Sequence, residues 1–502
     1  MNSFKRKALV SAVLGTLGVA GSAHAIYQDP NNLGQALVYP YYTVNNDPAG
    51  NPFNTFISVV NTTADVKVVK VRFREGKASE EVFDFNLYLS PNDVWTGAVI
   101  PSSTDTSSPG HLVTTDVSCT NPVIPSGGVD FRNYQYVGDP VGKNTLDRTR
   151  EGYAEMFEMG ILDPASAPWS AAVHALGSGG APACGSILTG NPAGGGAVAA
   201  AILAPTGGLS GTGTLINVAS GRDTMYNANA FGAWTALSAY SEIGNDAPNF
   251  SQTLPASSIV VDPGKSKVYF STWSGTVQSG LTVTAGARAA ASTMMHDAVI
   301  NEYILDAATA SDTDWVFTFP VKRLFVHGTA AITPFSNSLS TSGACEVINI
   351  TYFNREEVGA TPSGVDFSPL PPGNPANTLC WESTVLSVRN GSANAGGSNT
   401  TSLVLGSTNV TDINVSGTFQ NGWMRVSFGG ANATGVGLVS EATSVTVTAG
   451  TAATLAETFH GLPVVGFMIR TFNNGTLTCG TASCQGNYGG SAGHAYTLNV
   501  LP

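Results

Sequence analysis

Hydrophobic and polar residues alternate along several short segments of this 502-residue chain. Successive side chains of a β-strand point to opposite faces, so strict alternation predicts a strand with one apolar and one polar face. The segment 66–73 is the clearest case, because an apolar set alternates with a basic set: Val69, Val71 and Phe73 against Lys70, Arg72 and Arg74. The segment 82–89 alternates in the same way after a turn at Glu75 to Lys77.

Runs of this kind, bounded by Gly, Pro, Asn and Ser, recur along most of the chain. No segment combines a sustained apolar stripe at helical spacing with charges on the opposite face. The segment 197–203 is expected to form a short helix, and 287–295 is open to a helical reading. Further strands are predicted at 53–60, 94–100, 150–160, 214–218, 257–261, 267–273, 301–305, 314–319, 322–326, 346–353, 380–388, 423–428, 443–448, 464–472 and 495–500.

Short strands with frequent turn signals are typical of antiparallel sandwiches. We therefore predict an all-β fold made of antiparallel β-sandwich (Ig-like) blocks. The N-terminal block is expected to span 26–340, with a loop-rich insertion at about 101–213, where the alternation weakens and Gly and Ala accumulate. The polar stretch Ser336 to Gly343 marks the boundary to a C-terminal block at 341–502.

The first 25 residues have the pattern of a secretory signal peptide. Lys5 to Lys7 form a basic start, an apolar run follows, and Ala23 to Ala25 is a small-x-small cleavage site. Cleavage there removes three basic residues and no acidic one, so the formal net charge changes from −12 to −15. We expect an exported protein, in the periplasm, at the cell surface or outside the cell, without a transmembrane segment after cleavage and without a nucleic-acid partner.

Six cysteines follow the signal segment, and an even number in an exported chain predicts structural disulfide bonds rather than a metal site. Spacing alone does not fix the connectivity. The simplest hypothesis pairs neighbours along the sequence, as Cys119–Cys184, Cys345–Cys380 and Cys479–Cys484.

Charged residues make up only 11% of the chain, and the stretch from Arg74 to Gly97 is one of the few places where they concentrate. We interpret its charges as the solvated outer faces and turn tips of a sheet. In this reading Arg72 and Arg74 pair with acidic neighbours on adjacent strands.

The predicted strand 150–160 carries the best cluster of carboxylates, at Glu151, Glu155 and Glu158. Glu151 and Glu155 would share a face but stand about 13 Å apart, whereas glycosidase pairs need about 5–9.5 Å. Ordinary surface ion pairs are therefore expected here, although a carboxylate from another strand could complete a catalytic pair.

Three tyrosines, Tyr39, Tyr41 and Tyr42, form a candidate ligand patch near the mature N-terminus. Exposed rings of this kind bind sugars or a partner by stacking and burial, and the same residues can equally belong to the edge of the first core, which we favour. The metal content is unknown from the sequence.

Two further patterns are weaker. Gly489 to Gly493 matches the G-x-S-x-G pattern with His494 beside it, but a nucleophile elbow needs a strand before it and a helix after it, so the match is interpreted as chance. Asp312 and Asp314 could supply oxygen ligands to Ca²⁺, but two carboxylates fall short of the six to eight oxygens required, and a solvated turn is expected.

Several stretches together resemble a group of uncharacterised exported proteobacterial proteins of β-rich, cell-surface type. The stretches are ALVYPYYTV (36–44), VKVRFREGKASEEVFDFNLYLSPNDVWTG (69–97), TREGYAEMFEMG (149–160), NEYILDAATASDTDWVFTFPVKRLFV (301–326), GLPVVGFMIRTFNNG (461–475) and YGGSAGHAYT (488–497). Their spread over the mature chain implies one unit rather than a string of modules. The resemblance carries over no functional residues.

The pattern as a whole favours an exported, non-catalytic structural or adhesive protein of the cell surface or extracellular matrix, whose partners would be surface or matrix polymers. The alternative is an exported carbohydrate-binding protein or glycan hydrolase that uses the 151–158 strand or the tyrosine patch. Neither hypothesis requires a cofactor. The sequence does not identify the ligand or the oligomeric state.

Overall fold

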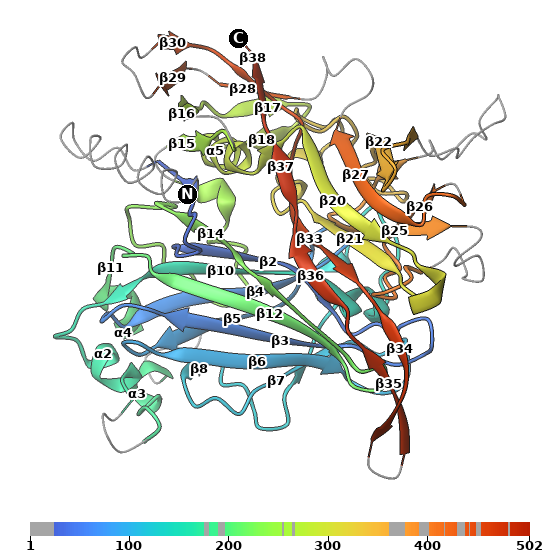
Figure 1. Ribbon diagram of the computed structural model, residues 1–502. Coiled ribbons are helices and arrows are strands. Elements are labelled where there is room, and N and C mark those ends of the chain that lie inside the picture. The colour runs from blue at the N-terminus through green and yellow to red at the C-terminus, as the bar shows by residue number, and fades with distance from the viewer. Residues whose placement is uncertain are drawn as a thin grey trace.

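The fold is mostly β. Strands make up 47% of the computed structural model and helices 10%, arranged as several antiparallel sheets (Figure 1). This composition confirms the predicted β class. The structure describes residues 25–174, 180–188, 196–253, 256–263, 267–360, 377–390, 401–415, 417–428, 437–440, 442–447, 453–479 and 482–501.

An eight-stranded antiparallel sheet, called here the first sheet, forms one layer of the N-terminal half. Its longest strand, β10, lies between β2 and β4. In spatial order the strands are β1 (Tyr27–Gln28), β14 (Asn229–Gly232), β2 (Ala36–Thr43), β10 (Glu151–Leu162), β4 (Lys67–Glu75), β5 (Glu81–Leu89) and β8 (Cys119–Asn121), with β11 (Ile202–Leu203) paired to β10.

A six-stranded antiparallel sheet, the second sheet, packs against one face of the first. The apolar side chains predicted from the alternation meet between the two layers, where Phe85 of the first sheet lies 5.5 Å from Trp95 of the second, measured between ring centroids. The strands of the second sheet are, in order, β13 (Arg222–Asn227), β12 (Leu209–Asn217), β3 (Asn54–Asn61), β6 (Val94–Pro101), β7 (Gly110–Val113) and β9 (Val129–Asp130).

The region 101–213, which was predicted as a loop-rich insertion, supplies strands to both sheets, namely β7, β8, β9, β10, β11 and the start of β12. It contributes β10, which is buried along nearly its whole length in the middle of the first sheet. The sequence places Gly152 where β10 bulges against β2, and a Cβ there would collide with the carbonyl group of Arg74. Glycine therefore permits the close approach of β10 to β4.

The C-terminal half holds a third sheet and a fourth sheet. The third sheet has the order β26 (Val410–Val415), β25 (Ser383–Asn390), β21 (Thr313–Thr318), β33 (Val465–Arg470) and β36 (Gly490–Gly493), and only β25 and β26 are parallel among its described pairs. The fourth sheet has the order β23 (Gly359–Ala360), β22 (Glu346–Asn354), β27 (Asn421–Phe428), β20 (Ala298–Ile304) and β37 (Ala495–Thr497), with β24 (Thr378–Leu379) beside β22.

A division of the chain at residue 340 would cut through both of these sheets. β21 pairs with β25 and β33, and β20 pairs with β27 and β37, although β20 and β21 precede that position in the sequence. Sheet pairing therefore does not follow the predicted boundary at Ser336 to Gly343.

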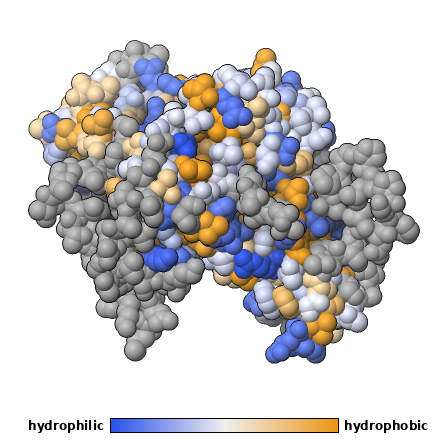
Figure 2. Space-filling view, turned by 90° about the horizontal axis from the view of Figure 1, so that it is seen from above, coloured by the Kyte–Doolittle hydropathy of each residue, from blue (hydrophilic) through white to orange (hydrophobic). Residues whose placement is uncertain are grey.

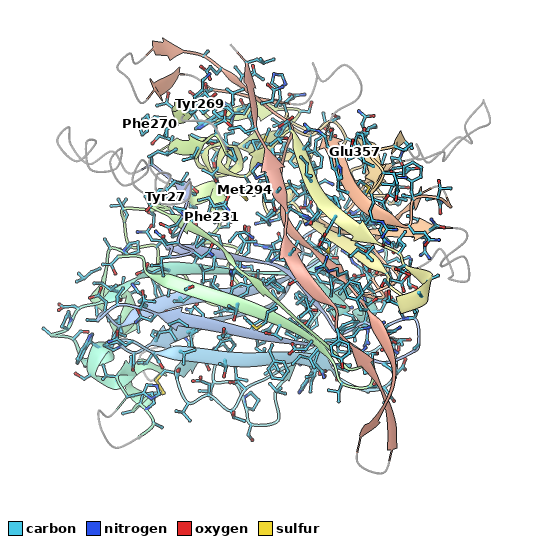
Figure 3. All side chains as sticks on the ribbon, viewed as in Figure 1. Tyr27, Phe231, Tyr269, Phe270, Met294 and Glu357 are labelled. Atoms are coloured by element: carbon cyan, nitrogen blue, oxygen red, sulfur yellow. A yellow bond between two sulfur atoms is a disulfide. The ribbon has the colours of Figure 1, made fainter. Side chains whose placement is uncertain are left out.

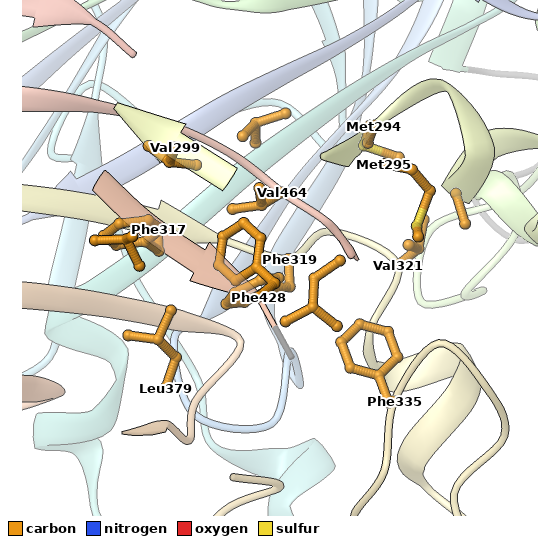
Figure 4. Close-up of a cluster of buried hydrophobic side chains, with 14 of the residues drawn as sticks. Met294, Met295, Val299, Phe317, Phe319, Val321, Phe335, Leu379, Phe428 and Val464 are labelled. Carbon is orange, nitrogen blue, oxygen red and sulfur yellow. The ribbon is translucent and has the colours of Figure 1, made fainter. Parts of the chain in front are cut away.

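The third sheet is buried on both faces. On one face Trp315 and Phe317 pack toward the fourth sheet, and Figure 4 shows Phe317, Phe319 and Phe428 in this core. On the other face Val316 and Phe467 join the core of the N-terminal half. The two halves thus share continuous apolar packing, which explains why the segment 313–318 has no exposed residue on either face.

Smaller elements cover the junction above the first sheet (Figure 1). The alanine-rich segment open to a helical reading forms α5 (Ala285–Thr293), whose first turn is capped by the hydroxyl of Thr284. Phe231 of the first sheet and Met294 after α5 belong to the same core cluster, and Figure 3 shows them at this junction. The surrounding strands are β15 (Ser257–Val261), β16 (Lys267–Thr272), β17 (Thr276–Gln278), β18 (Leu281–Val283), β19 (Met295–His296), β28 (Gly437–Val439), β29 (Ala442–Val447), β30 (Ala453–Leu455), β31 (Thr458–His460), β32 (Leu462–Pro463) and β38 (Asn499–Leu501).

The remaining elements are short. The strand predicted at 322–326 is wrong: its last four residues form helix α6 (Arg323–Val326), because a short apolar run does not distinguish a strand from one helical turn. The helix predicted at 197–203 corresponds to α4 (Gly196–Ala201). The others are α2 (Ala167–Ala172), α3 (Gly185–Leu188), the 3₁₀ turns η1 (Tyr134–Tyr136), η2 (Leu146–Arg150), η3 (Phe250–Gln252) and η4 (Ala307–Thr309), and the hairpin β34 (Asn473–Cys479) and β35 (Ala482–Asn487).

The surface is mixed in character. On the face seen in Figure 2, the apolar residues that are drawn in colour form small groups separated by polar ones. Across the described part of the chain, no helix has both the length and the apolar character needed to cross a membrane.

Candidate functional site

The polar face of the first sheet is buried. The alternation correctly places Lys70, Arg72 and Arg74 on one face of β4, but their side chains are at most 2% exposed. The segment 237–253 runs over this face and supplies backbone carbonyl groups as acceptors. Nζ of Lys70 donates to the carbonyl of Glu242 at 2.8 Å and lies 2.5 Å from the carboxylate of Asp84.

Arg72 and Arg74 bind this covering segment most extensively. The Arg72 guanidinium lies 2.7 Å from Glu81 and donates to the carbonyls of Asn245 and Pro248 at 2.9 and 3.0 Å. These contacts use three of the five N–H donors that arginine offers in a fixed plane.

Arg74 connects three segments of the chain. It donates to Glu155 on β10 at 2.7 Å, to the Ser79 carbonyl at 2.8 Å and to Asp246 at 2.7 Å. Asp246 also accepts from Arg323 of α6 at 2.6 Å. Burial opposes ionisation of Asp246, but the two guanidiniums prevail and hold the pKa of its carboxyl below the ordinary value.

The prediction that these charges lie on solvated outer faces of a sheet is therefore wrong, whereas the pairing of Arg72 and Arg74 with acidic neighbours is confirmed. The error arises because the residues that cover this face are far from β4 in the sequence. Alternation along β4 reveals which residues share a face, but the cover comes from residues more than 160 positions later. A substitution at Glu81 would remove a partner of the buried Arg72, so we expect it to cost more stability than a typical surface substitution.

Glu151 is also bound within the fold, although it begins β10. Its carboxylate accepts hydrogen bonds from the Tyr41 hydroxyl at 2.8 Å and the Ser407 hydroxyl at 2.6 Å. The backbone N–H and hydroxyl of Thr408 donate to it at 2.9 and 2.7 Å. Glu151 thereby ties the first sheet to residues 407–408 of the C-terminal half.

Glu158 binds a local segment. It accepts from Nζ of Lys67 at 2.7 Å and from the backbone N–H groups of Thr206 and Gly207 at 3.0 and 2.7 Å. The carboxylates of the predicted cluster thus have three separate sets of donors, with Glu155 bound to Arg74. The structure does not bring them together as a catalytic pair, and they are buried rather than in the predicted surface ion pairs.

The candidate ligand patch lies inside the protein. Tyr39, Tyr41 and Tyr42 are at most 1% exposed, and their hydroxyls donate to the Ser58 carbonyl, to Glu151 and to the Thr149 carbonyl. These rings therefore belong to the core, which is the reading we favoured, and they offer no surface for a ligand. β2 is fully buried because it lies between β14 and β10 with packing on both faces.

Two of the predicted cysteine pairs are joined. Cys119 and Cys184 lie at disulfide-bonding distance, as do Cys345 and Cys380. The first links β8 to the residue before α3, and the second links the residue before β22 to the residue after β24. The side chains of Cys479 and Cys484 lie outside the described residues, so the third pairing stays a prediction.

The G-x-S-x-G match has no nucleophile-elbow geometry. Ser491 lies inside strand β36, and another strand, β37, follows instead of a helix. The Ser491 hydroxyl donates to the Met225 carbonyl, while His494 makes its contacts with Asn301 and the Val316 carbonyl. The interpretation of this motif as chance agrees with these contacts.

Asp314 is buried within strand β21, so the solvated turn expected there is wrong. Its carboxylate accepts from the Ser387 hydroxyl at 2.7 Å and from the backbone N–H groups of Val404 and Leu405 at 2.9 Å each. Asp312 lies at the entry to the same strand. The described residues contain no cluster of three or more His, Cys, Asp or Glu side chains suited to a metal.

A cleft between the two halves is the first candidate site. It consists of two adjoining cavities of about 470 and 360 Å³ that share Asn32, His494 and Tyr496. His296 stacks on Tyr496 with ring centroids 4.1 Å apart, and its buried Nδ1 has no hydrogen-bond partner among the described residues. Burial lowers the pKa of His296 to about 3 and that of His494 to about 4, so both imidazoles are neutral near pH 7.

A groove on the outer edge of the first sheet is the second candidate site. It has a volume of about 360 Å³, and we call it the Tyr134 groove after the tyrosine on its rim, whose side chain is 74% exposed. Besides Tyr134, its lining includes Glu81, Phe83, Asp84, Arg132 and Gln135.

Sequence reasoning missed both candidate sites. The cleft joins residues near positions 30, 226, 296 and 494, and the groove joins 81–84, 122–135 and 243–244, so no local motif marks either site. One signal was available for the groove: the loop FRNYQYVGDP carries two tyrosines between turn-forming residues. Comparison with known proteins adds no name, since no protein-family model and no curated protein sequence matches the chain.

A buried carboxyl group at the contact between the halves introduces a pH dependence. Burial raises the pKa of Glu382 to about 8, against the opposing effect of Lys322. Its Oε2 accepts from the backbone N–H of Arg323 at 3.2 Å, and its Oε1 has no hydrogen-bond partner in the described part of the chain.

Glu382→Gln is expected to make the stability less dependent on pH. A folded-state pKa above the unfolded value means that the contribution of the protonated group is fully present below about pH 4.5 and is lost as the pH rises through about 8. We therefore subtract the free energy of unfolding of wild type from that of the variant at each pH. This difference should be larger at pH 9 than at pH 5, by at least about 1 kcal/mol. Urea denaturation at both pH values measures this, with the exposed Glu302→Gln as control. An unchanged pH profile in Glu382→Gln would contradict the expectation.

Proposed function

We propose that this chain is an exported, non-catalytic protein with a structural or adhesive role at the cell surface or in the extracellular matrix. The observation that carries the proposal is that Glu151, Glu155 and Glu158, the best candidates for acid–base chemistry, are all bound by donors of the fold itself. A catalytic carboxyl has to reach the substrate proton. These carboxylates instead cross-link distant parts of the chain.

Four features support export. The two disulfides fit an oxidising compartment. The signal-like start and the acidic balance of the remaining chain fit a protein outside the cytoplasm. The stretches that resemble exported proteobacterial proteins of cell-surface type point in the same direction.

We also infer that the packed sheets are β-sandwich blocks of Ig-like type. Support comes from the antiparallel order of the first and second sheets and from the apolar cluster between them. The third and fourth sheets enclose a second cluster in the same manner. Inner faces that interdigitate across two such sheets are the defining feature of sandwich packing.

The alternative function divides into two parts. A glycan hydrolase that uses the Glu151 to Glu158 strand loses its support, because the three carboxylates are buried and bound. Carbohydrate binding keeps a basis, but at the Tyr134 groove instead of the tyrosine patch in β2.

Fractionation of the native producing cells tests the proposal. We expect the mature chain in the surface or shed-matrix fraction, with its cysteines oxidised. A variant lacking residues 2–25 serves as the matched control and should stay in the cytoplasm with reducible or free thiols. Recovery of the full-length chain in the cytoplasm, or measurable glycan hydrolysis by the purified protein, would overturn the proposal.

A further inference from the structure

We propose that the Tyr134 groove binds an uncharged saccharide. This inference rests on the proposed adhesive role and names the class of ligand that the surface would hold.

The exposed ring of Tyr134 is mounted on a rigid support. Tyr134 begins the turn η1, and Tyr136 two residues later is buried with the Arg148 guanidinium 4.0 Å from its ring centroid. On the other side of Tyr134, the backbone N–H of Arg132 donates to the Val82 carbonyl of β5 at 2.9 Å. Because the backbone on both sides of Tyr134 is held and a tyrosine side chain has only two torsions, ordering this ring against a ligand costs little conformational entropy.

The wall of the groove formed by β5 is also fixed. Phe83 is half-buried and stacks on the buried Phe131, with centroids 5.7 Å apart and planes 20° from parallel. The groove therefore offers two aromatic side chains, Phe83 and Tyr134, and its volume of about 360 Å³ lies at the lower end of the range for ligand pockets. Apolar ring faces of this size suit the C–H faces of a sugar ring.

Planar polar groups surround this apolar surface. Gln135 and Arg132 are exposed and bring amide and guanidinium donors. Glu81 and Asp84 bring carboxylates, which accept up to about four hydrogen bonds each. Adjacent hydroxyls of a sugar present donors and acceptors at a spacing that such planar groups can bind in pairs.

The charge balance selects a neutral ligand. Glu81 is paired with the buried Arg72 at 2.7 Å, and Asp84 with the buried Lys70 at 2.5 Å. The backbone N–H of Gly244 also holds Asp84, at 3.0 Å. Because the carboxylates are neutralised from beneath, they do not demand a cationic ligand. The exposed Arg132 adds one positive charge to the lining, but the chain as a whole has a formal net charge of −12, which disfavours an anionic ligand.

The cleft between the halves is a weaker candidate for the same ligand. His494 and Ser491 already make hydrogen bonds within the protein, and the hydroxyl of Tyr496 lies 3.3 Å from the Gly466 carbonyl. In the Tyr134 groove the carboxylates of Glu81 and Asp84 are likewise paired, but the side chains of Arg132, Tyr134 and Gln135 are exposed.

The proposal can be tested by binding the purified oxidised chain to a panel of immobilised neutral and acidic oligosaccharides. We expect neutral glycans to bind, and titration calorimetry with the best neutral trisaccharide to give a saturable isotherm. Tyr134→Ala should weaken this binding at least about tenfold, and Gln135→Ala should weaken it to a smaller extent. Both positions are exposed, so the variants should unfold at the wild-type temperature.

Two control variants separate this site from general effects. Tyr488→Ala removes a comparably exposed tyrosine elsewhere, and Val137→Ala changes the same loop outside the groove; both should bind as wild type does. Absence of neutral-glycan binding, preference for acidic glycans, or binding that survives Tyr134→Ala would overturn the proposal. Fractionation is a separate measurement. If the chain is at the surface but binds no saccharide, only this inference is wrong. If the chain is cytoplasmic and binds saccharide, only the proposed function is wrong.

Discussion

Replacing Arg74 with methionine is expected to lower the free energy of unfolding by about 3–5 kcal/mol. The guanidinium has three partners, Glu155, Asp246 and the Ser79 carbonyl. Methionine keeps much of the side-chain volume but leaves the carboxylate of Glu155 buried, with Arg72 at 3.8 Å as the remaining cation. The loss therefore reflects an uncompensated buried charge rather than a cavity.

Arg425→Met is the matched control for this prediction. Arg425 is about one-third exposed and forms a pair with Asp297 at 3.1 Å. Because water solvates both partners, its replacement should cost less than about 1 kcal/mol. Urea denaturation of both variants at the same pH gives the comparison, and equal losses would show that the Arg74 pair is as well solvated as the control pair.

A double variant distinguishes burial of charge from loss of shape. The double variant Arg74→Met with Glu155→Leu lacks both buried charges. Apolar pairs of similar volume often replace a buried ion pair with little loss of stability. Arg72 keeps Glu81 and its backbone acceptors, and Asp246 keeps Arg323. The double variant is therefore expected to be more stable than Arg74→Met alone. A simple sum of the two single losses would contradict this account.

The β class and many of the strands could be predicted because they depend on local patterns. Alternation in β4 and β5 gave the correct set of inward apolar side chains, such as Phe85, because the period of a strand is fixed by its backbone. The basic residues on the other face of β4 were wrongly predicted to be solvated, because the burial of Lys70 and Arg72 depends on a segment far along the chain. Periodicity identifies the faces of a strand but not what covers them.

The burial of strands without alternation was harder to predict: β2 was not predicted as a strand, and β10 was predicted as a strand with surface ion pairs. β2 and β10 are buried on both faces, so their sequences mix tyrosines, glutamates and apolar residues without a polar side. Tyr41 and Glu151 each look like a surface or catalytic residue when considered alone, and only their contact explains both. The Tyr134 groove poses the same difficulty, since β5 and two loops have to be brought together before it exists.

Glu151→Leu is expected to lower the free energy of unfolding by about 3–5 kcal/mol and to loosen the segment 401–409. Leucine fills similar space but leaves the hydroxyls of Tyr41 and Ser407 and both donors of Thr408 without their acceptor. A buried donor that loses its acceptor costs about 1–3 kcal/mol, and solvent can reach part of the Thr408 side to offset some of that loss. Glu151→Gln keeps one carbonyl acceptor and should cost less than Leu.

Hydrogen exchange locates this effect. In Glu151→Leu the backbone amide of Thr408 should lose protection beyond the change expected from global stability, because its acceptor is gone. Glu158→Leu is the matched control: it removes a buried carboxylate from the same strand, but its donors are at 206–207, so the extra loss should appear there. Loss of protection confined to the first sheet in Glu151→Leu, with Thr408 unchanged, would mean that this carboxylate does not hold the two halves together. Loss at Thr408 would instead show that one carboxylate from the middle of the first sheet holds a segment more than 250 residues away in the sequence.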